Sequence, residues 1–249
     1  VSLFTWAERN DFYSDKNPFT GMTIKRADTL SKKRPPFTND DIDTFFSSPI
    51  YKGSKGVKPK ERMITGDVII KDYKYWIPLL GLYTGMRLNE ICQLMKDDIQ
   101  KIDGVWVINI DDSDCKKLKT ASSRRRVPIH DKVIAMGLLE YVRGVNHPRL
   151  FAELPKCGKG SYSYRFSKEF AIMLKNLGLK DRGLCFHSFR HSFIDGLRNA
   201  GVEKAIAMKL VGHHSTNDTH EGYGYGHNLE VLQRAVNQLK FDSQDGFMA

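Results

Sequence analysis

The stretch CFHSFRHSF, residues 185–193, carries side chains that could act together on an anion. In a helix, its phenylalanines share one face and its basic residues share the opposite face. These basic residues are His187, Arg190 and His191. Because the aromatic face can anchor the helix in a core, the basic groups would project together on the other side. Neighbouring cations repel each other unless an anion lies between them, so this segment predicts an anion-binding helix face.

A second candidate is TGMRLNEI, residues 84–91, in which Arg87 follows a glycine turn and opens a helix. A helix start offers unpaired backbone N–H groups and the positive end of the helix dipole, which both suit a phosphate. Glu90 lies one turn further on and could hold the guanidinium in place. Taken alone, the two residues are equally typical of a surface ion pair of little energetic value.

The third segment, LKTASSRRRVPI, spans residues 118–129 and combines a turn with a basic strand. Lys119 would project from the turn, where an amine can reach a substrate and deliver a proton. Arg124, Arg125 and Arg126 follow it on the strand. A solvated basic hairpin explains the same pattern.

The fourth segment, VGHHSTNDTHEGYGYG, spans residues 211–226. His213 follows a glycine at the end of an apolar helix, and Tyr223 and Tyr225 come about ten residues later between glycines. A histidine in such a place is usually a capping residue, and tyrosines beside glycines are usually part of a loop. By itself the segment predicts no chemistry.

The order of these groups along the chain is more informative than any one of them. An arginine, a hairpin lysine, a His-x-x-Arg pair, a Gly-His pair and a tyrosine follow each other. This order, with the boxes TGMRLNEI, HSFRHSF and VGHHS, resembles the catalytic domain of the tyrosine recombinases, the phage-integrase family, over roughly residues 35–240. The resemblance implies the recombinase catalytic-domain fold and a site-specific DNA recombinase or integrase from a phage or mobile element.

The resemblance also implies a role for each matched residue. Arg87 and Arg190 would bind the non-bridging oxygens of a scissile DNA phosphate, for which guanidinium forks are suited. Glu90 would hold Arg87 in place. His187 and His213 would hydrogen-bond the same phosphate.

Two further residues would carry out the bond exchange. Tyr223 would be the nucleophile and form a 3′-phosphotyrosyl intermediate, while Lys119 would protonate the departing 5′-oxygen. Since the ester conserves the bond energy, no ATP is needed, and because arginines neutralise the charge, neither a cofactor nor a metal is implied. We expect Arg124, Arg125 and Arg126 to bind DNA.

Two assignments stay open. Many members of the family place the tyrosine nine residues after the Gly-His histidine, whereas here the tyrosines fall ten and twelve residues on. The spacing of a threonine and a Tyr-Gly pair favours Tyr223, with Tyr225 as the alternative. Lys116 and Lys117 compete with Lys119, because leucine precedes Lys119 where the family often has a small polar residue.

Composition agrees with a nucleic-acid partner. The 249 residues carry 39 Lys and Arg against 29 Asp and Glu, a formal net charge of +10, which favours a polyanion. The four cysteines show no CxxC pair and predict reduced thiols in a cytoplasmic protein. The resemblance implies a bacterial or phage-encoded, nucleoid-associated protein. No apolar run reaches the roughly 18 residues of a membrane span, so no membrane partner is expected.

The apolar pattern predicts a mainly α-helical protein with one small antiparallel β-sheet. By the resemblance, residues 1–34 would be the end of a core-binding domain with a basic linker, and residues 35–249 the catalytic domain with its C-terminal helix and tail. Strands are expected at 104–110 and 125–129, with a third possible between them. Helices are expected from residue 38 or 39, around residues 73–84 and 86–95, and at 131–143, 161–177, 187–200, 203–211 and 227–240.

By resemblance, the C-terminal segment predicts a homo-oligomer, a tetramer on double-stranded DNA, with accessory DNA-bending proteins as further candidate partners. Three other classes compete. A type IB topoisomerase would share the chemistry, and a non-catalytic DNA-binding module would share the charge. A zinc enzyme could use His187, His191 and His213 or His214, but HSFRH lacks a zinc hydrolase's glutamate and would place Arg190 beside the metal.

Overall fold

The computed structural model describes residues 2–22, 34–113, 116–118, 120, 123–157, 161–212 and 228–241. The chain divides into two compact units, Val1–Lys33 and Arg34–Ala249. In the first unit, helix α1 (Ser2–Arg9) carries Phe4, whose ring packs edge-on against Tyr13 and Phe19. Trp6 stacks on Phe12. That this unit ends a core-binding domain stays a prediction.

The second unit is built around helix α4 (Tyr73–Thr84), whose twelve residues are all buried. Its first turn is capped by the side chain of Asp72, which accepts hydrogen bonds from two backbone N–H groups. Gly85 ends it in the left-handed conformation at φ 61°. A continuous apolar run without a polar face is what a central helix needs, since every side of it meets another element.

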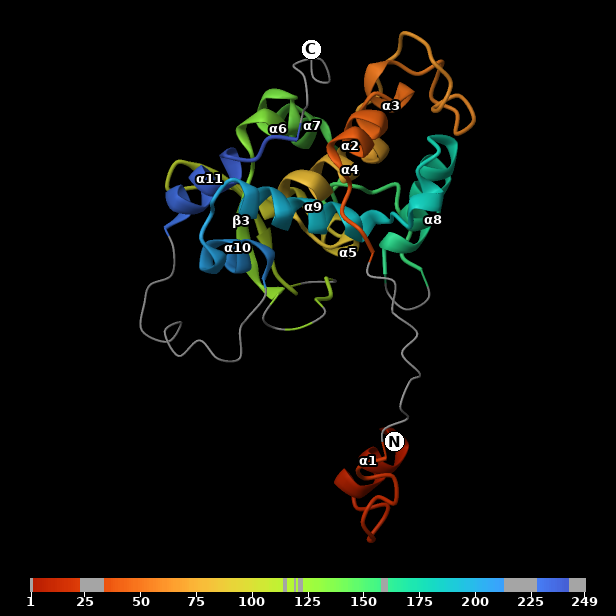
Figure 1. Cartoon of the computed structure of the whole chain (residues 1–249), viewed down its shortest axis with the longest axis vertical. Helices are drawn as coiled ribbons and strands as arrows, with labels where there is room; N and C mark the ends of the chain where they lie inside the picture. Colours follow the sequence, from red (N-terminus) through yellow and green to blue (C-terminus); the bar gives the residue numbers. More distant parts are fainter. Residues whose placement is uncertain are drawn as a thin grey trace. The chain divides into compact units, whose positions relative to one another are not determined.

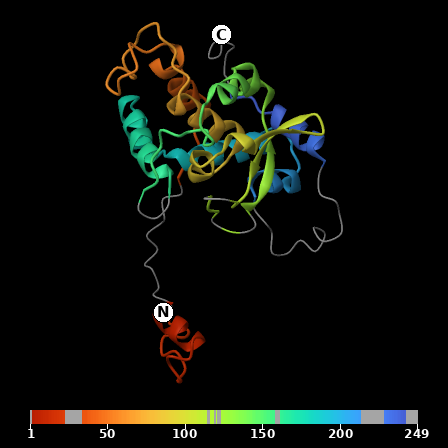
Figure 2. The same ribbon diagram turned by 180° about the vertical axis from the view of Figure 1, so that it is seen from behind.

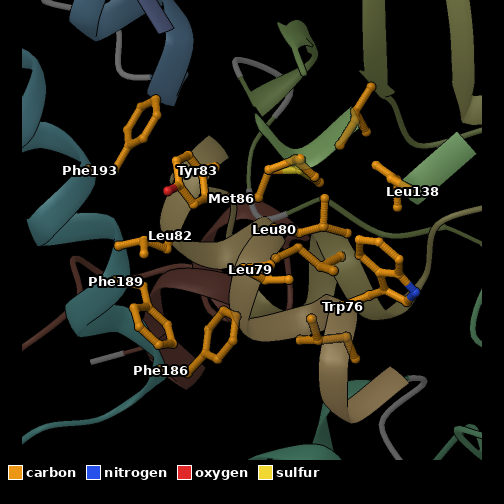
Figure 3. Packing of buried hydrophobic residues seen from close by; sticks show 14 of the residues in the cluster. Trp76, Leu79, Leu80, Leu82, Tyr83, Met86, Leu138, Phe186, Phe189 and Phe193 are labelled. Carbon is orange, nitrogen blue, oxygen red and sulfur yellow. The ribbon is translucent and has the colours of Figure 1, made fainter. Parts of the chain in front are cut away.

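Helix α9 (Phe186–Asn199) crosses α4 at the centre of the unit (Figure 1). As expected, Phe186, Phe189 and Phe193 are buried. Figure 3 shows them on the side of α9 that faces α4. Gly81 in α4 and Gly85 at its C-cap make room for them, because a Cβ on Gly81 would lie 2.6 Å from the ring of Phe186 and one on Gly85 2.5 Å from the ring of Phe193.

The other helices surround this pair. Helix α2 (Asn39–Phe46) begins at Thr38 with a capping box, as the sequence predicts, and buries Ile42, Phe45 and Phe46. The remaining helices are α3 (Pro49–Lys52), α5 (Leu88–Cys92), α6 (Asp131–Ala135), α7 (Leu138–Gly144), α8 (Ser163–Asn176), α10 (Lys204–Val211) and α11 (Leu229–Asn237), with 3₁₀ turns at Lys96–Asp98 and Lys180–Arg182.

One antiparallel sheet has the strand order β1 (Ile99–Ile102), β2 (Val105–Ile110), β3 (Arg125–Pro128). The last residue of β2, Ile110, pairs with Arg125. Helices α10 and α11 pack against β3 (Figure 2). The two strands expected from the sequence are confirmed, but the third lies before them instead of between them. It is joined to β2 by a tight turn at Asp103 and Gly104, both at positive φ.

Helix boundaries differ from the sequence prediction most clearly in two places. The helix expected over 131–143 is two helices, α6 and α7, separated at Gly137. The helix expected over 86–95 ends at Cys92, and Met95 pairs instead with Arg149 in a short β-bridge. The mainly helical class with one small antiparallel sheet is confirmed. Among the described residues, no helix has both the length and the apolar character that crossing a bilayer requires.

Candidate active site

Arg87 lies at the start of α5, immediately after the turn that ends α4, where the sequence places it. Its backbone N–H donates to Glu90 Oε2 at 2.9 Å, and its Nη1 donates to Glu90 Oε1 at 2.7 Å. The same Nη1 donates to Ser123 Oγ at 3.0 Å. Glu90 is buried and Arg87 is half-buried, so the pair is held in place and is not a loose surface ion pair.

Arg190 lies inside the protein, although helical spacing puts it on the side of α9 away from the phenylalanines. Its Nη1 donates to the carbonyl oxygen of Gly85 at 2.8 Å, and its Nη2 donates to that of Val211 at 2.5 Å. Burial, together with the nearby cations Arg125 and Arg87, lowers the pKa of Arg190 to about 9. The guanidinium therefore remains protonated at neutral pH, in a place that favours an added anion.

The three consecutive arginines of the basic strand do not share one direction. Arg124 and Arg126 are exposed, and Nε of Arg124 donates to Asp112 Oδ1 at 2.6 Å. Arg125 points inward, because side chains alternate along a strand, and it is buried. Its Nη2 donates to Glu90 Oε2 at 2.8 Å. The structure thus gives Arg124 and Arg126 positions on the surface and Arg125 a position inside the site.

Two guanidiniums, those of Arg87 and Arg125, therefore bind the Glu90 carboxylate, and that of Arg190 lies nearby. Burial by itself would raise the pKa of Glu90, but Arg125 and Arg87 outweigh that effect and lower it below its ordinary value. The carboxylate stays ionised and cancels one of the three positive charges of Arg87, Arg125 and Arg190. A fixed excess of positive charge in a partly desolvated place is suited to a phosphodiester that gains negative charge in a reaction.

His187 lies on the exposed face of α9, and its ring packs edge-on against that of His191 with centroids 4.9 Å apart. Loss of solvent around the ring, with His191, Arg190, Arg34 and Arg87 nearby, lowers the pKa of His187 to about 4. The imidazole is therefore neutral at neutral pH and offers one donor and one acceptor nitrogen. Among the residues that the structure describes, no three His, Cys, Asp or Glu side chains gather as a metal ion would require.

Arg34 is a cation of this region that the sequence analysis missed. Its Nη1 donates to Sγ of Cys185, the N-cap residue of α9, at 3.2 Å. Its effect on His187 shows that it also lies near that ring. A residue before two prolines looks like part of a linker, and only the folded chain brings it to the start of α9.

The lysine segment is anchored at the residues just before position 119. Nζ of Lys116 lies 2.6 Å from Asp98 Oδ1 and 2.6 Å from Asp111 Oδ1 and is buried. These carboxylates outweigh the effect of burial and raise the pKa of Lys116. A buried lysine bound in this way is a poor proton donor to a substrate, which removes one competitor of Lys119. The backbone of Lys117 bonds with the side chain of Gln93.

Three sequence-predicted residues, Lys119, His213 and Tyr223, lie outside the described residues, as do the alternatives His214 and Tyr225. The structure thus brings together Arg87, Glu90 and Arg190, and places His187 near Arg87 and Arg190. It adds Ser123 and Arg34 to this group, and it places Arg125, which was expected to bind DNA, inside the group beside Glu90. The sequence holds no local signal for Ser123, whereas strand alternation could have indicated that one of the arginines points inward.

Known proteins resemble the chain in sequence and in fold. The Rickettsia canadensis (strain McKiel) protein named "Tyrosine recombinase XerC" is 28% identical over 142 residues, which are 55% of this chain and 42% of that protein. The chain therefore spans less than half the length of this relative. The integrase of mycobacterium phage Brujita is 16% identical with a TM-score of 0.55, covering 99% of this chain and 72% of that one.

A third similar structure is the Tn1549 transposon integrase (residues 82–397) in complex with circular intermediate DNA. It is 18% identical, with a TM-score of 0.56, and the match covers 94% of this chain and 72% of that one. These likenesses show a shared fold. The model described as "Phage integrase family" matches residues 70–228, a range that contains every predicted catalytic position from Arg87 to Tyr223. Because the matched range covers more than half of the chain, this chain belongs to the phage integrase family.

Proposed function

We propose that the protein is a site-specific DNA recombinase that cleaves and rejoins DNA strands through a 3′-phosphotyrosyl intermediate, without ATP or a metal. The observation that supports this most is the cluster of Arg87 and Arg125, both bonded to the carboxylate of Glu90, with Arg190 close enough for their charges to lower its pKa. Such a cluster has a lasting excess of positive charge in a half-buried place. A scissile phosphate supplies the anion that this charge favours, and gains a further negative charge as it becomes pentavalent.

The arginines have donors left for a phosphate. The hydrogen bonds described for the Arg87 side chain all use Nη1, so Nη2 and Nε remain for a ligand as far as the described residues go. Arg190 donates one bond from each terminal nitrogen, and each of these nitrogens carries two hydrogens. In the proposed complex, the two residues bind the non-bridging oxygens of the phosphate, and neutral His187 donates a further hydrogen bond.

The bond exchange is assigned to residues outside the described part of the chain. The hydroxyl oxygen of Tyr223 attacks the phosphorus, and the bond between phosphorus and the 5′-oxygen breaks. Lys119 gives its proton to that departing oxygen, so a free 5′-hydroxyl and a 3′-phosphotyrosyl ester result. Attack by a 5′-hydroxyl on the ester reverses the sequence and rejoins DNA, with no net consumption of bond energy.

The proposal includes the partners that such a reaction needs. We expect double-stranded DNA as the substrate, a homo-oligomer (a tetramer) on it, and DNA-bending proteins as possible accessories. The Tn1549 integrase structure holds circular intermediate DNA, which supports DNA as the ligand of this fold. We expect the protein to act in a bacterial cytoplasm, on the nucleoid or on phage DNA.

A nicked suicide substrate tests the proposal, because loss of the short strand beyond the nick traps the covalent adduct. We expect a denaturation-resistant adduct with the wild-type protein and none with Tyr223→Phe, whose DNA affinity should stay nearly unchanged. Tyr225→Phe is the matched control and should keep adduct formation. If instead only Tyr225→Phe abolishes the adduct, the nucleophile assignment is reversed, and an adduct that depends on neither tyrosine contradicts the proposed function.

A second assay separates recombination from relaxation. A plasmid that carries two copies of the target site should yield recombinant products. Relaxation of plasmids of any sequence, without recombinant products, would instead identify a type IB topoisomerase.

A further inference from the structure

Arg125 is one of the most constrained side chains near the site, with only 2% of it exposed. Each of its three guanidinium nitrogens donates to a different part of the chain. Nη2 bonds to Glu90 Oε2 at 2.8 Å, and Nε bonds to the carbonyl oxygen of Leu210 at 2.8 Å. Nη1 donates to the carbonyl oxygen of Ser123 at 2.9 Å. Arg125 therefore links α5, the end of α10 and the start of its own strand.

These acceptors are the groups that hold the candidate phosphate ligands. Glu90 and Ser123 are the two side chains that accept from Nη1 of Arg87. Leu210 precedes Val211, whose carbonyl oxygen accepts from Arg190. A change in the position of Arg125 would therefore displace the groups that hold Arg87 and Arg190 in place.

The backbone beyond α10 is shaped to fit this side chain. Gly212 caps α10 in the left-handed conformation at φ 66°, and a Cβ on it would lie 3.0 Å from Cδ of Arg125. The chain continues directly from Gly212 into His213. The close approach of Arg125 to Gly212 thus leaves little room for a larger side chain at the end of α10.

We propose that Arg125 is a positioning residue of this site, which fixes Glu90, and through it Arg87, relative to the end of α10. This inference rests on the proposed function, because it concerns the rate of the DNA cleavage assigned there. Arg125 itself is turned towards three protein acceptors, so it acts on the phosphate through its neighbours. A planar guanidinium can reach three acceptors in fixed directions, whereas the ammonium group of lysine is a compact point charge.

The test compares Arg125→Lys with wild type, in the full chain, on the nicked suicide substrate. The charge is kept, so we expect DNA affinity to stay close to that of wild type. The rate of adduct formation at saturating DNA should fall by about 10–100-fold, as for other losses of support behind reacting groups. The matched control is Arg143→Lys on α7, an exposed arginine paired with Glu140 in the same helix, which should change neither value.

The pH profile of Arg125→Gln gives a readout that a purely structural role would not move. Without the guanidinium beside it, Glu90 should take up a proton at a higher pH than in wild type. The acidic limb of the pH profile of the adduct-formation rate should then move to higher pH in Arg125→Gln. In Arg143→Gln this limb should stay at the wild-type pH. An unmoved limb with a normal rate would contradict the proposal.

A second variant covers the case in which Arg125→Lys does not fold. Gly212→Ala leaves the guanidinium intact but pushes a methyl group against its stem, and should also slow adduct formation at unchanged affinity. If folded Arg125→Lys, or Gly212→Ala in its place, forms adduct at the wild-type rate, the positioning role is wrong. Absence of adduct from the wild-type protein would instead contradict the proposed function itself.

Discussion

At the scale of single residues, the site is defined by how strongly each polar group is held. Glu90 is bonded to two arginines, and Lys116 lies between two aspartates. These groups are fixed before any ligand arrives, which is what electrostatic stabilisation of a transition state requires. His187 differs from them, because it is exposed and its described ring contact is with His191.

The protonation of His187 gives the first prediction at this scale. Arg34 is one of the cations that lower its pKa to about 4, so Arg34→Gln should raise that pKa, as measured by NMR titration of the ring protons. Arg143→Gln is the control and should leave the titration unchanged. An unchanged titration in Arg34→Gln would show that the two groups do not interact.

The same shift has a consequence for stability. The ordinary pKa of 6.5 lies above the folded value of about 4, so the unfolded chain binds more protons between these limits. The contribution of His187 is therefore fully present above pH 6.5 and is lost as the pH falls towards 4. An added phosphodiester should raise the pKa of His187, because an anion favours the protonated ring.

The second prediction concerns Lys119. Lys119→Ala should slow cleavage of ordinary DNA by about 10²–10⁴-fold, the usual contribution of a general acid. It should spare a substrate with sulfur in the 5′-bridging position, because a thiolate leaves without a proton. Lys116→Ala is a poor replacement test, since Lys116 is bound to Asp98 and Asp111. If the sulfur substrate is cleaved equally slowly, Lys117 becomes the residue to examine.

At the scale of elements, the crossing of α4 and α9 places Arg87 and Arg190 within the same network. Gly85 ends α4, packs against Phe193 and accepts a hydrogen bond from Arg190 through its carbonyl oxygen. One short turn thus serves the core and the site together. A change in the packing of this turn should therefore displace the arginines.

The third prediction tests that turn. Gly85→Ala should lower the free energy of unfolding by about 2–4 kcal/mol, from the positive φ and from overpacking against Phe193. Gly104→Ala is the matched control, since Gly104 also has positive φ but no atom within 4 Å of an added Cβ. Its free energy of unfolding should fall by only about 1–2 kcal/mol, the cost of the left-handed conformation for a residue with a Cβ. Chemical denaturation measures both values, and equal losses would show that contact with Phe193 does not matter.

The elements differ in how well the sequence predicts them. Helices α2, α4 and α9 follow from apolar spacing and capping residues, and their boundaries agree closely with the structure. Strand β1 was missed because IQKI is short and half polar, although the Asp-Gly pair after it is a strong hairpin signal. The helix predicted over 86–95 is longer than the observed α5, because the apolar pattern continues to Met95. In the structure Met95 instead forms a β-bridge with Arg149, which depends on tertiary packing.

The candidate site shows the same limit. The Arg87–Glu90 contact is local, within one helical turn, and spacing alone could indicate it. The bonds from Arg190 to the carbonyl oxygens of Gly85 and Val211 join three separate elements. No local pattern encodes such bonds, because they depend on how α4, α9 and α10 pack together.

At the scale of the whole molecule, the net charge of +10 leads to the fourth prediction. Binding to DNA of any sequence should weaken steeply with salt, with log affinity falling by roughly 0.9 per phosphate contact for each unit of log salt concentration. Fluorescence anisotropy with labelled duplexes at several salt concentrations measures this slope. Arg126→Ala, at an exposed position on β3, should make this slope shallower by about 0.9, which corresponds to the loss of one phosphate contact. Affinity that does not change with salt would contradict a role for phosphate contacts.

The central place of α4 also has a consequence for how the protein is made. Its apolar surface is covered largely by α9, which begins about a hundred residues later in the chain. At a synthesis rate of about 5–20 residues per second, the ribosome needs roughly 5–20 s to produce that covering helix. During this interval the growing chain exposes its most apolar helix, so its yield in a cell should depend on chaperones that bind nascent polypeptides.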